Sequence, residues 1–174
     1  MRRVLVLGCP GAGKSTLARS LGEALSLPVV HLDKLWWKSG WVNRTEGEFD
    51  ALLDAVLLGE EWVIDGNYLR TLPRRLERCD AVVLLDYPRR VCLFRALRRI
   101  LSWRGRPRPD MAADCPERLD GEFVRWIWEF HRTQRPRVLE LLDGWKGEAH
   151  IFRSPAQCAA FLAQQKNQNT PGME

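Results

Sequence analysis

The chain has 174 residues, 45% of them hydrophobic, and carries 27 Lys and Arg against 22 Asp and Glu. This length and composition fit one folded domain with its own core and exclude a wholly disordered chain. The longest apolar run, 158–163, is far shorter than the roughly 20 residues that span a bilayer, so neither a membrane span nor a signal-peptide core is expected. The net charge of +5 suggests an anionic partner.

Short apolar runs alternate with amphipathic stretches along the chain. The apolar runs predict strands over 4–7, 29–32, 62–64, 81–85 and 149–152. The amphipathic stretches predict helices over about 14–25 and 45–58, one from 89 onward, one around 119–130 that Pro136 interrupts or restarts, and one over 155–164. Continuous apolar strands separated by helices predict a parallel sheet covered on both faces. We therefore expect an α/β fold of three layers around a five-stranded parallel sheet, as one domain over 1–164 with a polar tail over 165–174.

The cysteines give no sign of a disulfide framework or a zinc site. They are odd in number and never in Cys-x-x-Cys spacing, at Cys9, Cys79, Cys92, Cys115 and Cys158. A reducing cytoplasm is the expected compartment.

The string from Gly8 to Ser15, GCPGAGKS, matches the phosphate-binding loop G-x-x-x-x-G-K-[ST] in full. Glycines let the backbone curl so that its N–H groups point at phosphate oxygens, and the following helix adds the positive end of its dipole. Lys14 is expected to reach the β- and γ-phosphates, and the Ser15 hydroxyl to bind Mg²⁺. The nucleotide-binding residues predicted from this loop are Gly8, Gly11, Ala12, Gly13, Lys14, Ser15 and Thr16.

Two aspartates follow predicted strands, Asp33 after the second and Asp65 after the third. Both should lie at the carboxyl edge of the sheet, facing the bound phosphates. One could hold Mg²⁺ while the other accepts a proton from a substrate hydroxyl. We assign Asp65 to the metal with Ser15, and Asp33 to the acceptor; the alternative for both is a turn or helix-cap role.

The loop, Asp65-Gly66 and Tyr87-Pro88 followed by arginines together resemble the adenylate kinase-like P-loop kinases. In that family two arginines follow the proline by seven and eleven residues, and here those positions are Arg95 and Arg99. The resemblance implies that Arg95 lies against the adenine near phosphate and that Arg99 reaches the transferring phosphate. It also implies Mg²⁺ and ATP as cofactors and a short arginine-rich lid over about 103–117.

Four further strings resemble the bacterial group labelled DNA topology modulation proteins, a label that defines no substrate. They are LDKLWW at 32–37, WVIDGNY at 62–68, RPDM at 108–111 and WIW at 126–128. The chain departs from adenylate kinases at Asn67-Tyr68, where those enzymes have Phe-Pro-Arg near their monophosphate. The lid has a single cysteine, Cys115, which excludes a zinc-bearing lid. Both departures put AMP as the acceptor in doubt.

The positive charge of the chain is concentrated in the segment 87–109, which has eight arginines and no acid, so the rest carries a small negative charge. We predict a function for Arg95 and Arg99 and solvated positions for Arg89, Arg90 and Arg98. For the lid arginines Arg104, Arg106 and Arg108, contact with phosphate and simple solvation are both open. A nucleic-acid patch is not favoured, because no nucleic-acid-binding motif is present.

Other singled-out residues have a structural and a functional interpretation. Trp62, Trp103 and Trp145 are predicted to be core or half-buried residues. Trp36, Trp37 and Trp41 either form a wall for the acceptor or pack their loop onto Phe49. His31 is predicted to be structural, and Cys9 to fill space.

The sequence thus predicts a cytoplasmic kinase that moves the γ-phosphate of Mg·ATP to a small acceptor, with Lys14, Asp33 and Arg99 as catalytic residues. No membrane partner is expected, and the chain could be a monomer or a dimer. The alternative is a regulator of DNA topology that uses ATP as a switch.

Overall fold

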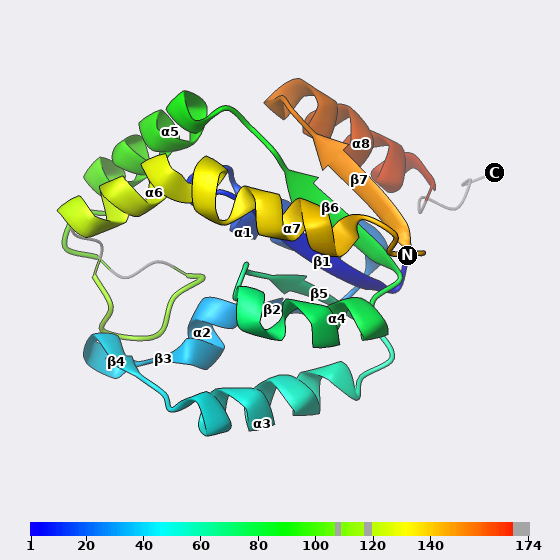
Figure 1. Cartoon of the computed structure of the whole chain (residues 1–174), viewed down its shortest axis with the longest axis horizontal. Coiled ribbons are helices and arrows are strands. Elements are labelled where there is room, and N and C mark those ends of the chain that lie inside the picture. The colour runs from blue at the N-terminus through cyan, green and yellow to red at the C-terminus, as the bar shows by residue number, and fades with distance from the viewer. Residues whose placement is uncertain (107–108, 117–119, 169–174) are drawn as a thin grey trace.

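Five parallel strands form the central sheet, in the order β2-β5-β1-β6-β7. The computed structural model describes residues 1–106, 109–116 and 120–168. The five strands are β1 (Arg3–Gly8), β2 (Val29–His31), β5 (Trp62–Asp65), β6 (Ala81–Leu85) and β7 (Glu148–Phe152). The sheet runs through the middle of the molecule with helices in front and behind (Figure 1). The predicted α/β fold with a five-stranded parallel sheet is confirmed.

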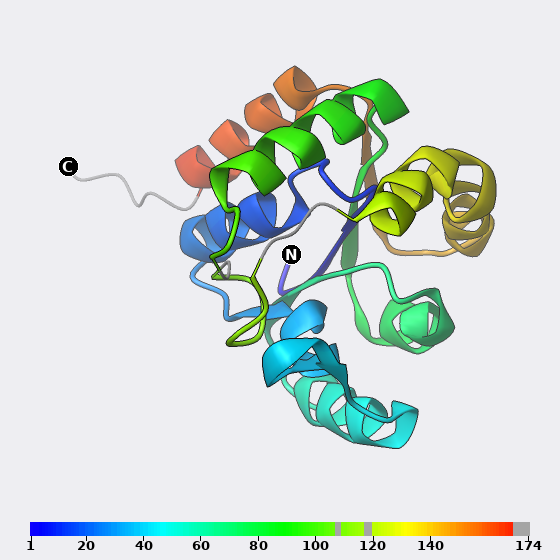
Figure 2. The same cartoon turned by 90° about the vertical axis from the view of Figure 1, so that its left-hand side faces the viewer.

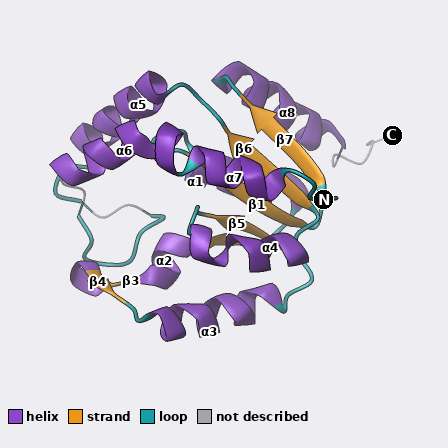
Figure 3. Cartoon of the chain, viewed as in Figure 1, coloured by secondary structure: helices purple, strands orange, loops and turns teal. Residues whose placement is uncertain are grey.

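The helices follow the strands in the order expected for parallel crossovers (Figure 3). They are α1 (Lys14–Leu25), α2 (Leu32–Trp36), α3 (Glu46–Leu57), α4 (Leu72–Arg78), α5 (Arg89–Ser102), α6 (Gly121–Thr133), α7 (Arg135–Leu142) and α8 (Pro155–Gln168). The described part of the chain has no helix long and apolar enough to cross a membrane.

The sheet has an apolar core on each face because alternate residues of a strand point to opposite sides. On one face Val4 and Val6 of β1 pack with residues of α1, α6 and α8. On the other face Leu5 and Leu7 pack with residues of α3, α4 and α7. All four side chains are fully buried, which is the reason that this strand is apolar throughout rather than alternating.

The stretch after β2 differs from the polar loop that the sequence predicts. Asp33 does not end a strand; it lies in the first turn of the short helix α2. A small antiparallel pair follows, β3 (Trp37–Lys38) and β4 (Val42–Asn43), joined by the 3₁₀ turn Ser39–Trp41. The guanidinium of Arg44 donates to the carbonyls of Lys34 and Leu35 at the end of α2, at 3.3 and 3.1 Å. A helix of five residues held by a distant side chain has no periodicity to reveal it.

Helix α4, preceded by the 3₁₀ turn Leu69–Thr71, was missed by the sequence analysis. Its sequence LPRRLER has three arginines among few apolar residues, yet Leu72, Arg75 and Leu76 are all buried. Other boundaries differ little: Thr45 caps α3 with the predicted capping box, and α7 begins beside Pro136. Helix α8 continues four residues beyond the predicted end, into the segment expected to be a polar tail. Leu119, placed on the predicted helix around 119–130, lies outside the described residues.

Candidate functional site

The phosphate-binding loop joins β1 to α1 at the carboxyl edge of the sheet. Gly11 has a φ of +82°, and a Cβ there would lie 2.2 Å from the Cys92 carbonyl oxygen of α5, so only glycine fits. Gly13 has a φ of +100° and precedes α1 without any side-chain cap. The first N–H groups of α1 therefore have no side-chain acceptor, which is the arrangement that binds a phosphate.

Asn67 fastens the start of this loop, a role that sequence reasoning missed. Its side-chain oxygen accepts a hydrogen bond from the Gly8 N–H at 3.0 Å, and its Nδ2 donates to the Gly8 carbonyl at 2.9 Å. Asn67 follows β5, and its side chain is buried. Asn67, which stands where adenylate kinases have the Phe-Pro-Arg pattern, thus connects the loop after β5 to the phosphate loop.

Arg75 of α4 fixes the loop after β5 in turn. Its guanidinium is fully buried and donates to the carbonyl oxygens of Gly66 at 2.9 Å, of Tyr68 at 3.0 Å and of Asn67. Burial lowers the pKa of Arg75 to about 9, because a charge loses its hydration inside the protein. Among the described residues no carboxylate forms an ion pair with Arg75, so its hydrogen-bond partners are these three carbonyl oxygens.

Two cavities adjoin at the phosphate loop. The first, about 570 Å³, is lined by 11–17 of the loop and α1 and by residues of α5 and α8. The second, about 490 Å³, is lined by residues that follow β2 and β5 and by residues of α6. Both are lined by Lys14, Ser15 and Arg99. We call them the phosphate-side cavity and the acceptor cavity.

The arginines of α5 lie partly as predicted. Arg95 lines the phosphate-side cavity, donates to the Ala12 carbonyl at 3.2 Å and lies over the ring of Tyr87. Arg99 lines both cavities and lies over the ring of Phe123. Arg98 is exposed, as predicted, and it also lines the phosphate-side cavity. Trp103 lines the same cavity and is half-buried, as predicted. Arg89 stacks on Trp128, with its guanidinium carbon 4.1 Å from the ring centroid.

Asp65 lies at the end of β5, beside the phosphate loop. It pairs in register with His31 of β2, and their side chains meet with His31 Nδ1 2.9 Å from Asp65 Oδ2. The other oxygen, Oδ1, is buried and has no hydrogen-bond partner among the described residues. His31 is buried, as predicted, but its contact with Asp65 was not anticipated.

These residues fit a magnesium ion. Asp65 and Ser15 line the same cavity, and a carboxylate oxygen and a hydroxyl are the hard oxygen donors that Mg²⁺ prefers. A buried carboxylate oxygen without a partner is costly unless a cation or water satisfies it. Among the described residues no cluster of three or more His, Cys, Asp or Glu forms an all-protein metal site, so substrate phosphates and water would complete the coordination.

Asp33 reaches the acceptor cavity from α2 although it does not end a strand. The Tyr68 hydroxyl donates to Asp33 Oδ1 at 2.8 Å. Burial first, and the neighbouring Asp33 charge second, raise the pKa of Tyr68, so the hydroxyl keeps its proton. Asp33 is thus held as a hydrogen-bonded carboxylate, which can accept a proton or orient a hydroxyl.

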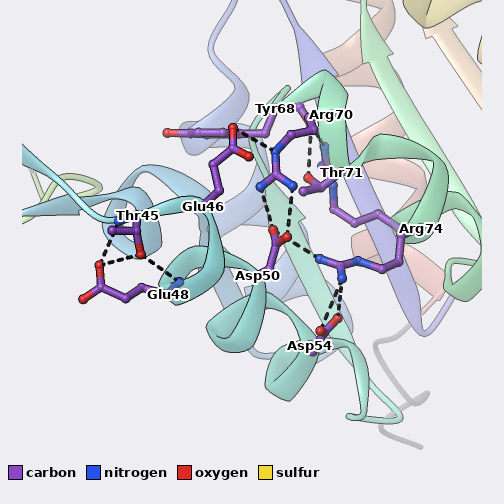
Figure 4. A network of polar contacts seen from close by, with 10 residues as sticks. Thr45, Glu46, Glu48, Asp50, Asp54, Tyr68, Arg70, Thr71 and Arg74 are labelled. Atoms are coloured by element: carbon purple, nitrogen blue, oxygen red, sulfur yellow. Dashed lines mark hydrogen bonds and ion pairs between the residues drawn. The ribbon is translucent and has the colours of Figure 1, made fainter.

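A polar network between α3 and α4 supports the Tyr68 loop (Figure 4). Arg70 contacts Asp50 at 2.9 and 2.6 Å, and Arg74 contacts Asp50 at 3.4 Å. The Thr71 hydroxyl donates to the Tyr68 carbonyl at 3.1 Å. Tyr68 itself has a φ of +34°, a conformation that side chains rarely adopt, so the contacts around it are needed to hold it.

The tryptophans after Asp33 all line the acceptor cavity, at Trp36, Trp37 and Trp41. Trp36 also packs edge-on against Phe49 of α3, with ring centroids 5.5 Å apart, so the predicted packing onto Phe49 is confirmed for this residue. Trp37 and Trp41 pack against each other instead. A role of the three rings as a wall for the acceptor stays a prediction.

The lid segment after α5 descends toward α2 and β4 (Figure 2). It docks on the small hairpin: the Ser39 hydroxyl donates to Asp114 at 2.7 Å, and the Trp41 N–H to Cys115 Sγ at 3.3 Å. Cys115 is fully buried by this docking. Arg104 and Arg106 are exposed and line neither cavity. Arg108, and the predicted lid end at Glu117, lie outside the described residues.

Cys9 is buried inside the phosphate loop, as a space-filling residue should be. A hydrogen bond with Cys92 and burial raise the pKa of the Cys9 thiol. A thiol that keeps its proton is a poor nucleophile, which agrees with the structural interpretation.

The chain is distantly similar to proteins that carry kinase names. No family model matches the chain. A protein of Thermococcus onnurineus named "Putative adenylate kinase" is 28% identical over 145 residues, which are 79% of this chain and 73% of that protein. A protein of the same name from Pyrococcus abyssi is 26% identical over the same shares. An adenylate kinase isoenzyme 6 homolog of Caenorhabditis elegans is 29% identical over 84 residues, 48% of this chain and 41% of that protein.

Solved structures with the same fold include two shikimate kinases. A shikimate kinase from Acinetobacter baumannii, in complex with shikimate, superposes with a TM-score of 0.60 at 17% identity and covers 94% of this chain and 90% of that one. A shikimate kinase from Bacteroides thetaiotaomicron superposes with a TM-score of 0.57 at 20% identity, and the match covers 96% of this chain and 97% of that one. The chain therefore has the fold of the P-loop kinases.

Proposed function

We propose that the chain is a phosphotransferase that moves the γ-phosphate of Mg·ATP to a small acceptor molecule. The observation that carries this proposal is the meeting of the two cavities at Lys14, Ser15 and Arg99. A protein that only binds ATP needs one cavity. A second cavity on the far side of the phosphate position is what a transfer in line from donor to acceptor requires.

The residues divide into a donor group and an acceptor group. The loop amides, the α1 N-terminus and Lys14 would hold the phosphates of ATP, and Arg95 and Arg98 would flank the nucleotide. Arg99 lines both cavities, so its positive charge can stabilise the phosphoryl group as charge develops on it. Asp33, oriented by Tyr68, would accept the proton of the attacking hydroxyl.

Ser15 and Asp65 would hold magnesium, which when bound neutralises phosphate charge. His31 would prepare Asp65 for this, because it contacts one carboxylate oxygen while the other is buried without a hydrogen-bond partner among the described residues. The names of the distant relatives support a nucleotide kinase in general, but the acceptor is a separate question.

The DNA topology modulation group, which four sequence strings suggest, stays a prediction, as does DNA as a partner. The structure gives reason to prefer a small-molecule acceptor. Of the eight arginines in the basic segment, Arg95, Arg98 and Arg99 line the cavities and Arg89 is stacked on Trp128. Among the described residues of this segment, Arg90, Arg104 and Arg106 remain to form a separate surface, which is fewer cations than proteins usually place on a phosphate backbone.

Asp33→Asn tests the acceptor side of this proposal. Asparagine can still accept the Tyr68 hydrogen bond, but it cannot take a proton, so we expect kcat to fall about 10²–10⁴-fold with little change in the KM for ATP. Coupled ADP release, with a panel of nucleosides, nucleotides and sugars to find the acceptor, measures this. Asp143→Asn, at an exposed position outside both cavities, is the matched control. Wild-type kcat in Asp33→Asn would refute its assignment as the base.

A further inference from the structure

We propose that the acceptor cavity takes an uncharged molecule with a planar ring and a hydroxyl group, a nucleoside, and rejects nucleoside monophosphates. This inference rests on the proposed function and narrows it to one class of acceptor. It runs against the expectation that the names of the distant relatives would raise, because adenylate kinases phosphorylate a monophosphate. The charges and the aromatic rings that line the cavity support a nucleoside.

Carboxylates outnumber cations, three to two, among the described residues that line the acceptor cavity. Among the described residues that line it, Asp33, Asp65 and Asp120 are acidic and only Lys14 and Arg99 are cationic. Both cations also line the phosphate-side cavity, so they are placed for the phosphate being transferred. In the described lining no cation then remains for a second phosphate group.

A monophosphate would bring about two negative charges into this acidic space. Charges in a partly enclosed cavity are screened less than charges on an open surface, so repulsion from Asp33 and Asp120 would be felt strongly. A neutral hydroxyl meets no such repulsion, and it can donate a hydrogen bond to the Asp33 carboxylate. The charge pattern therefore selects against monophosphates and in favour of uncharged alcohols.

Aromatic rings reach the cavity from two separate parts of the chain. On one side Trp37 and Trp41 form an edge-on pair with centroids 5.1 Å apart, and Trp36 lies 6.1 Å from Tyr68. From α6 come Phe123 and Trp126, with centroids 6.1 Å apart.

These rings offer stacking surfaces. Any of the nucleobases can stack on an aromatic side chain, because every base has a π-face. The cavity volume of about 490 Å³ is in the range of small-molecule sites and leaves room for a nucleoside.

The test is a paired binding measurement on the intact chain. The phosphate-side cavity is first filled with magnesium and a non-hydrolysable ATP analogue, so that only the acceptor cavity is free. Tryptophan fluorescence then follows titrations with adenosine, cytidine, AMP and CMP. We expect each nucleoside to bind at least tenfold more tightly than its own monophosphate. Equal or tighter binding of the monophosphates would overturn the proposal, and so would the absence of nucleoside binding at millimolar concentration.

Asp120→Asn gives a second, independent test, which concerns the charge of the cavity. Asp120 caps α6 by accepting from the Glu122 N–H at 2.9 Å, and asparagine caps a helix equally well, so the fold should be retained. Removing this carboxylate should raise the affinity for AMP relative to adenosine severalfold. Glu122→Gln removes the same charge two residues away, outside the lining, and should leave that ratio unchanged. An unchanged ratio in Asp120→Asn would contradict the charge argument.

Choline, a cationic alcohol without a ring, distinguishes selection by charge from selection by a planar ring. Aromatic side chains also attract quaternary ammonium groups, so tighter binding of choline than of either nucleoside would overturn the assignment of a planar ring. Failure of the proposed function looks different: nucleosides would bind in the expected order, but no ADP would be released from ATP in their presence.

Discussion

Replacing Lys14 with methionine is expected to lower phosphoryl transfer about 10²–10³-fold, the cost typical of losing one charged group that stabilises a transition state. Methionine keeps the aliphatic stem of lysine and removes the charge. Lys14 lies in the first turn of α1, and its Nζ is 3.4 Å from the Cys9 carbonyl, so the side chain curls over the loop that should hold phosphate. Lys14 also lines both cavities, and the variant should therefore lose ATP affinity as well.

Two measurements separate these effects from misfolding. Thermal unfolding without ligand should be nearly the same for Lys14→Met and the wild type, whereas added Mg·ATP should stabilise only the wild type. Lys146→Met, which removes the same charge from the exposed loop between α7 and β7, is the control and should behave as the wild type. If Lys14→Met transfers phosphate at the wild-type rate, the assignment of the phosphate loop is wrong.

Replacing Arg75 with methionine is expected to destabilise the fold by about 3 kcal/mol or more, since the carbonyls of Gly66 and Asn67 would lose their side-chain donor and that of Tyr68 would lose one of its donors. The loop after β5 depends on these hydrogen bonds, because Tyr68 has a rare φ of +34°. When this loop relaxes, Asn67 should release Gly8, and Tyr68 should release Asp33. We therefore expect weaker ATP binding together with the lower stability.

Urea unfolding gives the stability as a shift in midpoint at constant slope. Arg74→Met is a matched control, because Arg74 is the adjacent residue but is partly exposed and paired with Asp50 and Asp54 (Figure 4). Exposed ion pairs contribute about 0–1 kcal/mol to stability, so the Arg74→Met control should be only slightly less stable than the wild type. Arg75→Lys keeps the charge but has fewer hydrogen-bond donors, so its stability should lie between those of Arg75→Met and Arg74→Met. Equal stabilities for Arg75→Met and Arg74→Met would contradict the role assigned to Arg75.

The phosphate loop and the sheet were predictable because their signals are local. A full loop pattern between an apolar run and an amphipathic stretch fixes a strand, a turn and a helix, and α1 was predicted with the correct bounds, 14–25. The continuous apolar runs predicted all five strands because a parallel sheet is buried on both faces. Thr45 and Glu48 likewise predicted the start of α3 through hydrogen bonds within one turn.

The supporting residues of the site were not predictable because their partners are distant in sequence. Asn67 binds Gly8 across two neighbouring strands, and His31 meets Asp65 only because β2 pairs with β5. Nothing in the string around Arg75 marks a buried arginine. Asp33 was expected at a strand end and lies in α2, but it reaches the acceptor cavity all the same, because α2 begins where β2 ends.

The most direct test of the account follows the γ-phosphate itself. ATP labelled in its γ-phosphate is incubated with the intact protein, magnesium and adenosine or cytidine, and the products are separated. We expect the label to move to the nucleoside and one ADP to form for each labelled product, and we expect Lys14→Met to slow both about 10²–10³-fold. Label found only in inorganic phosphate, with its release stimulated by DNA and unaffected by small acceptors, would contradict the assignment of this chain as a small-molecule kinase.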